Sequence, residues 1–349
     1  MNDIELKPFE NCPALDGYHC VTGSLAKIYY YFGHPLSEDM LLGLGAGMGF
    51  IYWKMKMQDE TYIFIGGRAN NQGFFTDLGN RTAVKINSIS TNSARKAEAA
   101  LLEKLKERQP VMLFADMGLL PWFEFPIEYH FGGHTFVVCG FDGKDALLVA
   151  DMDQKAAGLK QGFYAPVTLQ QLALARNSKY KPFPPANQYL EFDFSTFHPP
   201  EPTGIYSAIA QCVDMQLHPP IKNFGVKGIR YTSSELRRWP ELFKDHELRM
   251  SLFNLYIFIE VGGTGGGCFR YMYSRFLKES AEITQNKGLL DVSQNIYQSG
   301  QLFSEVARLF VDSETAPDLQ DRIRCASDLF TQIAGIEERA YTDLSKCLP

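Results

Sequence analysis

Three residues far apart in the sequence have the side-chain types that a thiol-based catalyst needs. Cys20 is the candidate nucleophile, His134 the candidate base and Asp151 the candidate acid that orients the base. A thiol becomes an effective nucleophile when a base takes or shares its proton, and the base works best when a third group fixes its ring. The sequence therefore predicts covalent catalysis through the thiol of Cys20.

The stretch GYHCVTGSLAKIYYYFG (17–33) predicts a helix that carries Cys20 in its first turn. Apolar residues follow at helical spacing, at Val21, Leu25, Ile28 and Phe32. The start of a helix favours negative charge, so a thiol there loses its proton more easily. We expect His19 to point away from Cys20, because adjacent helical residues do not face one another. The alternative is a buried cysteine that only packs as a small apolar residue.

His134 and Asp151 are predicted to lie on two neighbouring strands. The segment GGHTFVVCGFDGKDALLVAD (132–151) has β-branched and aromatic residues on both sides of a turn. If Gly143 and Lys144 form a two-residue turn, His134 lies diagonal to Asp151 on one face of the hairpin. A slip of one residue would separate the two side chains.

Other residues compete for these two roles. Asp153 is an equal candidate for the orienting acid, and His130 is the alternative base. His130 and His134 would face one way on a helix and could then share a metal ion, but their segment has the composition of a strand. No CxxC pair occurs, which argues against a zinc site. The sequence thus predicts neither a metal ion nor any other cofactor.

The order of cysteine, histidine and acid along the chain is that of papain-like enzymes. Strand and helix signals are mixed up to a proline-rich segment at 195–204, and only helical periodicity follows it. The predicted fold class is therefore α+β, with a papain-like domain at 1–198 followed by an all-α domain at 199–349. Three helices have side chains suited to N-capping, at Ser37, Ser93 and Thr168.

Composition excludes several classes of protein. The 349 residues carry a formal net charge of −6, with 45% apolar and 21% charged residues. An acidic chain has no overall field for nucleic acid, so we expect none as a partner. Neither a signal peptide nor a membrane span is evident, and seven irregularly spaced cysteines do not form a disulfide framework. We expect a cytoplasmic protein that does not bind membranes.

Two glycine-rich segments have different implications for binding. GLGAGMGFIYW (43–53) lacks the spacing of either nucleotide-binding fingerprint and indicates a bend where backbones pass closely. GGTGGGCFR (262–270) precedes a helix and predicts a site for a carboxylate, phosphate or amide oxygen. The residues expected to bind it are Gly263, Thr264, Gly265, Gly266 and Arg270. The alternative is a flexible link between helices.

Several of these segments together resemble a known family. HCVTGSLAKIYYYFGHPLSEDMLLGLGAGMGFIYW and GGHTFVVCGFDGKDALLVAD resemble the N-terminal domain of the butirosin biosynthesis protein H family. The later IEVGGTGGGCFRYMYSRFLKESA resembles the helical domain that accompanies it, so that the likeness extends over residues 10–285. The resemblance implies a role in secondary metabolite biosynthesis and places Cys20, His134 and Asp151 at the positions of a catalytic triad.

The resemblance also implies a reaction. A thiol acyltransferase of this kind takes an aminoacyl-type group from the thioester of an acyl carrier protein and passes it to a small-molecule amine through an acyl-Cys20 intermediate. The oxyanion would be bound by the backbone N–H of Cys20, with Asn11 as the expected second donor. Two alternatives use the same fold: a cysteine amidase or peptidase with water as acceptor, and a non-catalytic small-molecule binding protein.

A carrier protein of the usual acidic kind needs a basic surface to dock on. The segment 222–249 has a net charge of +3, because it contains seven Lys and Arg residues and four Asp and Glu residues. We expect the carrier to dock there, although an ordinary solvated helix face has the same composition.

Overall fold

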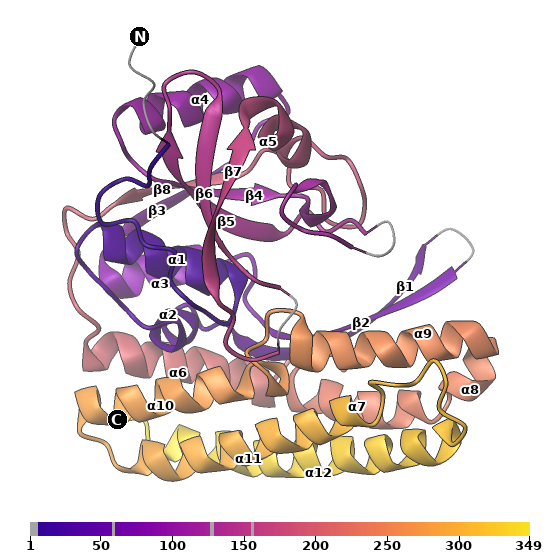
Figure 1. The fold of residues 1–349 in the computed structure, drawn as a ribbon. Coiled ribbons are helices and arrows are strands. Elements are labelled where there is room, and N and C mark those ends of the chain that lie inside the picture. The colour runs from indigo at the N-terminus through magenta and orange to yellow at the C-terminus, as the bar shows by residue number, and fades with distance from the viewer. Residues whose placement is uncertain (1–5, 58–59, 126–128, 155–156) are drawn as a thin grey trace. The chain divides into compact units, whose positions relative to one another are not determined.

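The chain folds into two compact units, each built from more than one segment (Figure 1). The computed structural model describes residues 6–57, 60–125, 129–154 and 157–349. The first unit comprises residues 1–41, 83–153 and 159–199, and the second comprises 42–82, 154–158 and 200–349. The last crossing between the units is at 199/200, one residue after the expected boundary at 198/199. Residues 42–82, expected in the first domain, fold with the second unit instead.

The first unit is built on a six-stranded antiparallel sheet with the order β3-β8-β4-β5-β6-β7. Its strands are β3 (Lys85–Ile89), β4 (Val111–Ala115), β5 (His134–Phe141), β6 (Ala146–Met152), β7 (Gly162–Thr168) and β8 (Tyr189–Asp193). The central strands β4 to β6 are almost wholly buried because helices cover both faces of the sheet. Helix α1 (Cys20–Tyr31) lies on one face, and α4 (Ala94–Lys106) and α5 (Leu169–Arg176) lie on the other (Figure 1).

The predicted helix starts are confirmed. Helix α1 begins at Cys20, as the spacing of its apolar residues indicated. Ser93 accepts a hydrogen bond from the backbone N–H of Lys96, and Thr168 forms a capping box with Gln171. Each cap satisfies backbone donors that the first turn of a helix leaves unpaired.

The hairpin of β5 and β6 has the predicted register on the side of the bulge that carries His134 and Asp151, but its turn differs from the predicted one. Val137 pairs with Ala150 and Val138 with Val149, as expected from the predicted turn. A bulge at Cys139 then shifts the register by one residue before the turn. The turn is consequently longer than the two residues predicted, and its N–H groups donate to the Asp142 carboxylate.

The second unit is helical apart from one hairpin, β1 (Met48–Met57) and β2 (Glu60–Arg68). In the described residues from 200 onward only helices occur, so the predicted all-α character of this segment is confirmed. The helices are α3 (Phe74–Thr82), α6 (Pro202–Leu217), α7 (Gly225–Leu236), α8 (Trp239–Leu242), α9 (Asp245–Tyr256), α10 (Arg270–Thr284), α11 (Gly288–Arg308) and α12 (Leu319–Lys346), with short helical turns η2 (Ile257–Val261) and η3 (Gly267–Phe269). Helix α2 (Glu38–Leu44) spans the point where the chain enters this unit.

The hairpin belongs to the second unit because its apolar residues pack among these helices. The ring of Phe50 lies 6.0 Å from that of Phe303 on α11 and 6.4 Å from that of Phe330 on α12. Gly67 on β2 lies against the backbone of Cys268, where a Cβ would come within 2.4 Å of the carbonyl oxygen. Only glycine fits there, so the hairpin approaches η3 more closely than any side chain would permit.

None of the helices in the described ranges combines the length and the hydropathy needed to cross a lipid bilayer.

Candidate active site

Cys20 is the first residue of α1 and retains 8% of its surface exposed. The helix is buried along most of its length and packs on β5, the strand that begins at His134. Packing of this helix on the sheet therefore places the thiol beside the imidazole. The peptide dipoles of α1 favour a thiolate at this end of the helix.

His134 and Asp151 are joined by a short hydrogen bond across the β5–β6 hairpin. Nε2 of His134 lies 2.9 Å from Oδ2 of Asp151, and the two residues are 1% and 2% exposed. Asp151 is held in turn by two donors. The indole Nε1 of Trp122 donates to Oδ2 at 2.9 Å, and the backbone N–H of Met152 donates to Oδ1 at 2.8 Å. Asp151 is therefore an acid that contacts the candidate base directly.

The thiol and the imidazole shift each other's pKa in opposite directions. Burial would raise the pKa of Cys20, but the nearby rings of His19 and His134 hold it well below its usual value. Burial would lower the pKa of His134, but the Asp151 carboxylate and the Cys20 thiol raise it to about 10. These shifts favour a thiolate and an imidazolium side by side at neutral pH. Since Nε2 faces Asp151, Nδ1 is the ring nitrogen left to serve the thiol.

The expectation that His19 points away from Cys20 is wrong. Nδ1 of His19 lies 3.9 Å from Sγ of Cys20, and the charge of its ring is the largest of the influences that lower the thiol pKa. The helical neighbour rule fails here because His19 is the N-cap, with an extended backbone at φ −135° and ψ 134°. The position of His19 just before the helix was the signal in the sequence for this placement.

Glu38 fixes the loop that precedes the nucleophile. Its buried carboxylate accepts hydrogen bonds from the backbone N–H groups of Tyr18 and His19, at 2.7 and 3.1 Å, and from the Thr22 hydroxyl at 2.6 Å. Burial raises the pKa of Glu38 even though these donors oppose the shift. This contact was not predicted, because the carboxylate comes from the start of the next helix.

Aromatic side chains cover the candidate base. The ring of Phe123 meets that of His134 edge-on, with centroids 5.3 Å apart, and Phe136 lies 6.0 Å away on the same strand. Trp122 packs edge-on against Phe136 at 5.3 Å. These rings keep water away from His134 and Asp151, which strengthens the attraction between the imidazole and the carboxylate. The run PWFEF (121–125) was the unused signal in the sequence, since Trp122 in this run also donates a hydrogen bond to Asp151.

A buried lysine lies below the nucleophile on the same helix. Lys27 is 1% exposed, and its Nζ lies 3.4 Å from the carbonyl oxygen of Gly23. Burial lowers the pKa of Lys27, whereas the carboxylates of Glu38 and Asp151 raise it. Its positive charge offsets the two acids that the site keeps away from water.

His130, the alternative base, has a different partner. Its Nδ1 lies 2.9 Å from Oδ2 of Asp116, and its ring stacks on that of Tyr180 at 3.3 Å. Ser178 donates to the same Asp116 oxygen at 2.6 Å, and Phe131 donates its backbone N–H to the other oxygen. This cluster anchors both ends of the segment that carries Trp122 and Phe123.

The other predicted site residues are not brought to Cys20 by any described hydrogen bond. Asn11 is exposed, in a left-handed turn with φ 59°, and its role as an oxyanion donor stays a prediction. In the residues that the model describes, no group of three or more His, Cys, Asp and Glu side chains is arranged to hold a metal ion.

The glycine-rich loop of the second unit is tied to acids of its own unit. The N–H of Gly266 donates to Oγ1 of Thr264, and the N–H of Gly267 donates to Oε2 of Glu260. Arg270 is fully buried and forms two hydrogen bonds with the Glu337 carboxylate, at 2.7 and 3.0 Å. Its remaining Nη1 donates to the carbonyl oxygens of Gly49 and Cys268. The guanidinium therefore stabilises the fold and is not open to a substrate. This differs from the expectation that Arg270 binds an oxygen of a ligand.

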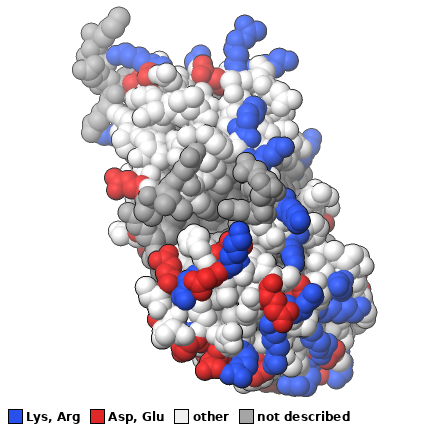
Figure 2. Space-filling view, turned by 90° about the vertical axis from the view of Figure 1, so that its right-hand side faces the viewer, with Lys and Arg blue, Asp and Glu red and all other residues white. Residues whose placement is uncertain are grey.

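The basic segment 222–249 is largely ion-paired. Arg230 pairs with Glu338, Arg237 with Asp328, Arg238 with Glu235 and Arg249 with Asp245. Two of these acids come from α12, which the local charge balance did not include. Figure 2 shows Lys and Arg side chains lying beside Asp and Glu side chains on one face of the molecule.

Comparison with known families supplies an independent result. Residues 19–152 match the family model described as "Butirosin biosynthesis protein H, N-terminal". Residues 170–344, about half of the chain, match the model described as "Domain of unknown function (DUF4872)". No curated protein matches the chain. The first match includes Cys20, His134 and Asp151. The chain therefore belongs to the DUF4872 family, and the part before that domain is similar to the N-terminal domain of butirosin biosynthesis protein H.

Proposed function

We propose that the protein is a cysteine-dependent acyltransferase that moves an aminoacyl-type group from a carrier-protein thioester to an amine. The observation that supports it best is the buried contact of Cys20, His134 and Asp151, with a lowered pKa on the thiol and a raised pKa on the imidazole. Such a pair supplies a nucleophile and a proton donor without outside activation. The similarity of residues 19–152 to the N-terminal domain of a biosynthetic protein is consistent with this reaction.

The first half of the proposed reaction loads the acyl group on the enzyme. The Cys20 thiolate attacks the thioester carbonyl, and the bond between carbonyl carbon and donor sulfur breaks. The departing donor thiolate takes the proton of the His134 imidazolium, which leaves acyl-Cys20 and a neutral imidazole. The backbone N–H of Cys20, at the start of α1, is the donor proposed for the oxyanion.

The second half transfers the acyl group to the amine. The amine nitrogen attacks acyl-Cys20 while neutral His134 takes its proton, and the Cys20 thiolate leaves. This step restores the imidazolium and the thiolate. The aromatic cover formed by Phe123 and Phe136 favours an amine acceptor over water, because excluded water cannot compete for the acyl group.

Intact-mass analysis with small aminoacyl thioesters tests the proposal. Wild-type protein should gain the mass of one acyl group, and Cys20→Ala should gain none. Adding simple amines should release the acyl group as amide. Release as free acid at the same rate with and without amine would instead identify a cysteine hydrolase. The absence of any mass gain across a broad thioester panel would contradict the assignment of Cys20 as nucleophile.

The role of Asp151 has its own test in the pH dependence of thiol alkylation. Wild-type Cys20 should react with iodoacetamide with a midpoint well below that of a free thiol, because its pKa is lowered. Asp151→Asn removes the charge that raises the pKa of His134, so less imidazolium remains to stabilise the thiolate. The alkylation midpoint should therefore rise by about one pH unit or more.

Asp153→Asn is the matched control for this experiment, because the sequence offered both acids for the same role. Its alkylation midpoint should stay at the wild-type value. A shift in Asp153→Asn with none in Asp151→Asn would reverse the assignment.

The acyl donor is proposed to dock through the basic segment 222–249. Charge reversal of Arg237 and Arg238 should slow transfer from a carrier-bound thioester about tenfold at low salt, since steering by exposed charges is screened by salt. Both arginines are exposed to a large extent, at 52% and 61% of their side chains. Transfer from a small thioester should not change. Equal rates for wild type and variant at every ionic strength would remove this segment as the docking site.

A further inference from the structure

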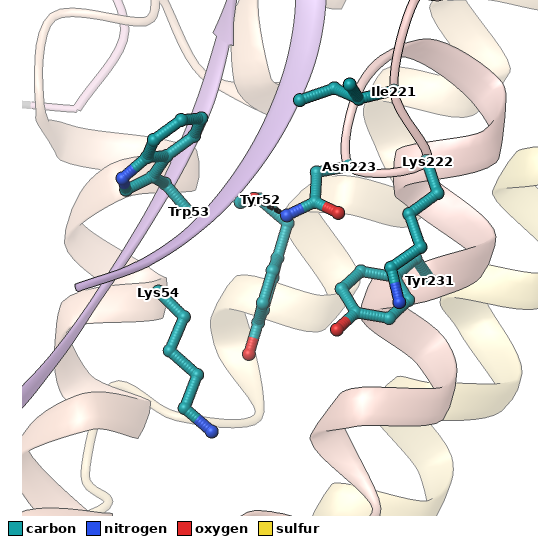
Figure 3. A pocket seen from close by; sticks show the side chains of 7 residues that line it. All are labelled: Tyr52, Trp53, Lys54, Ile221, Lys222, Asn223 and Tyr231. Atoms are coloured by element: carbon teal, nitrogen blue, oxygen red, sulfur yellow. Dashed lines mark hydrogen bonds between the residues drawn. The ribbon is translucent and has the colours of Figure 1, made fainter.

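The second unit contains a pocket of about 480 Å³, and part of its lining lies in the basic segment 222–249 (Figure 3). All of its lining residues belong to that unit, and they come from β1, from the loop before α7 and from α7 itself. They are Tyr52, Trp53, Lys54, Ile221, Lys222, Asn223 and Tyr231. A volume of this size is typical of sites for small organic molecules.

The base of the pocket is held by hydrogen bonds and ring contacts. The backbone N–H of Tyr52 donates to the carbonyl oxygen of Asn223 at 2.9 Å, and the Asn223 side chain donates to the carbonyl oxygen of Tyr52 at 3.1 Å. The buried Tyr52 hydroxyl accepts from Nε1 of Trp239 at 3.2 Å. Its ring meets that of Tyr231 edge-on, with centroids 5.5 Å apart. The strand and the loop therefore form one wall whose shape exists before any ligand arrives.

Two lysines supply the charge of the pocket. Nζ of Lys222 lies 4.2 Å from the centre of the Tyr231 ring, which holds the ammonium group at the pocket. Lys54 lies two residues after Tyr52 on β1 and so points to the same side of the strand. In Figure 3 the two lysine side chains lie on either side of the Tyr52 ring. None of the seven lining residues is acidic, and neither lysine has an ion pair with any residue that the structure describes.

The two lysines favour a ligand with a negative group, and the apolar lining residues indicate the rest of that ligand. Trp53 and Ile221, which line the pocket, leave 40% and 46% of their surfaces exposed. A ligand with an apolar body would cover them. A metal ion has no suitable ligand here, because hard cations require acidic or carbonyl oxygens in number. An inorganic anion would leave the aromatic walls in water.

We propose that this pocket binds a small organic anion with an aromatic body, for which an aromatic carboxylate is the simplest representative. The exposed ring of Trp53 and the free edge of the Tyr231 ring provide contacts for the ligand ring. Lys54 and Lys222 bind its carboxylate from two sides. Binding at this site is independent of the thiol chemistry of Cys20.

The experiment uses 2-naphthoate as the probe and full-length protein in isothermal titration calorimetry. Wild type should bind one equivalent of 2-naphthoate, and the neutral analogue 2-naphthamide should bind at least about fivefold more weakly. Lys54→Gln and Lys222→Gln should each weaken naphthoate binding about fivefold. Lys56→Gln is the matched control, because Lys56 lies on the same strand and does not line the pocket. It should bind as wild type does.

Three results would overturn the proposal: no binding of naphthoate at millimolar concentration, equal binding of the amide, or equal binding by both lysine variants. The comparison of carboxylate with amide is made on wild-type protein and so does not depend on how well a variant folds. Cys20→Ala should bind naphthoate with wild-type affinity. The pocket and the acyl transfer are therefore tested separately.

Discussion

His134→Gln should slow acyl transfer on the order of 10⁴-fold, the largest effect on activity that we expect outside the nucleophile itself. The variant loses the proton donor for the departing thiolate and the base for the incoming amine. It also loses the imidazolium that lowers the pKa of Cys20. Rates of acyl-enzyme formation and of amide release, followed by intact mass, should both fall.

His130→Gln is the matched control, since the sequence offered both histidines as the base. Glutamine can keep a hydrogen bond to Asp116, so this variant should stay within about tenfold of wild type. A loss in His130→Gln as large as in His134→Gln would show that the Asp116 cluster takes part in the chemistry. A small effect of His134→Gln would contradict the proposed mechanism.

The second large effect concerns stability. Arg270→Met leaves the Glu337 carboxylate buried without its counter-charge, and we expect a loss of about 3–5 kcal/mol in the free energy of unfolding. Both side chains are fully buried, and burial alone would lower the pKa of Arg270, whereas Glu337 raises it above its ordinary value. Arg270 also loses its contacts with the carbonyl oxygens of Gly49 and Cys268. Urea unfolding followed by circular dichroism gives the measurement.

Two further variants make the cause of this loss identifiable. Replacing both partners, as in Arg270→Met with Glu337→Leu, should recover part of the stability, because no buried charge then remains. Arg230→Met breaks an exposed pair with Glu338 and should cost less than about 1 kcal/mol. Equal losses for Arg230→Met and Arg270→Met would show that burial is not what makes the Arg270 pair important.

The sequence predicted local features well because local physics determines them. Helix α1 starts at Cys20, and Ser93 and Thr168 cap their helices, since each depends on residues within one or two turns. The register that joins His134 to Asp151 was also predictable, because alternation along a hairpin fixes which side chains share a face. The bulge at Cys139 was not predictable, since it depends on what packs against the strand.

Features that join distant segments could not be read from the sequence. Trp122 reaches Asp151 from a loop, and Glu38 reaches the loop before α1 from the next helix. The sequence predicted that Arg270 binds a ligand. Its actual partner, Glu337, lies 67 residues away and could not be recognised from the sequence. The same limit applies to residues 42–82, because Phe50 and Gly67 pack on residues that lie more than 200 positions later in the chain.

The interleaving of the two units has a consequence for how the protein is made. During synthesis the β1–β2 hairpin emerges early, but Phe303 and Phe330, against which Phe50 packs, are translated more than 200 residues later. The hairpin must therefore wait with its apolar face uncovered until nearly the whole chain has left the ribosome. A gene cut at the 198/199 boundary would release a fragment with that face permanently exposed, prone to aggregation. We expect the two halves to yield folded protein only when they are translated together or co-expressed.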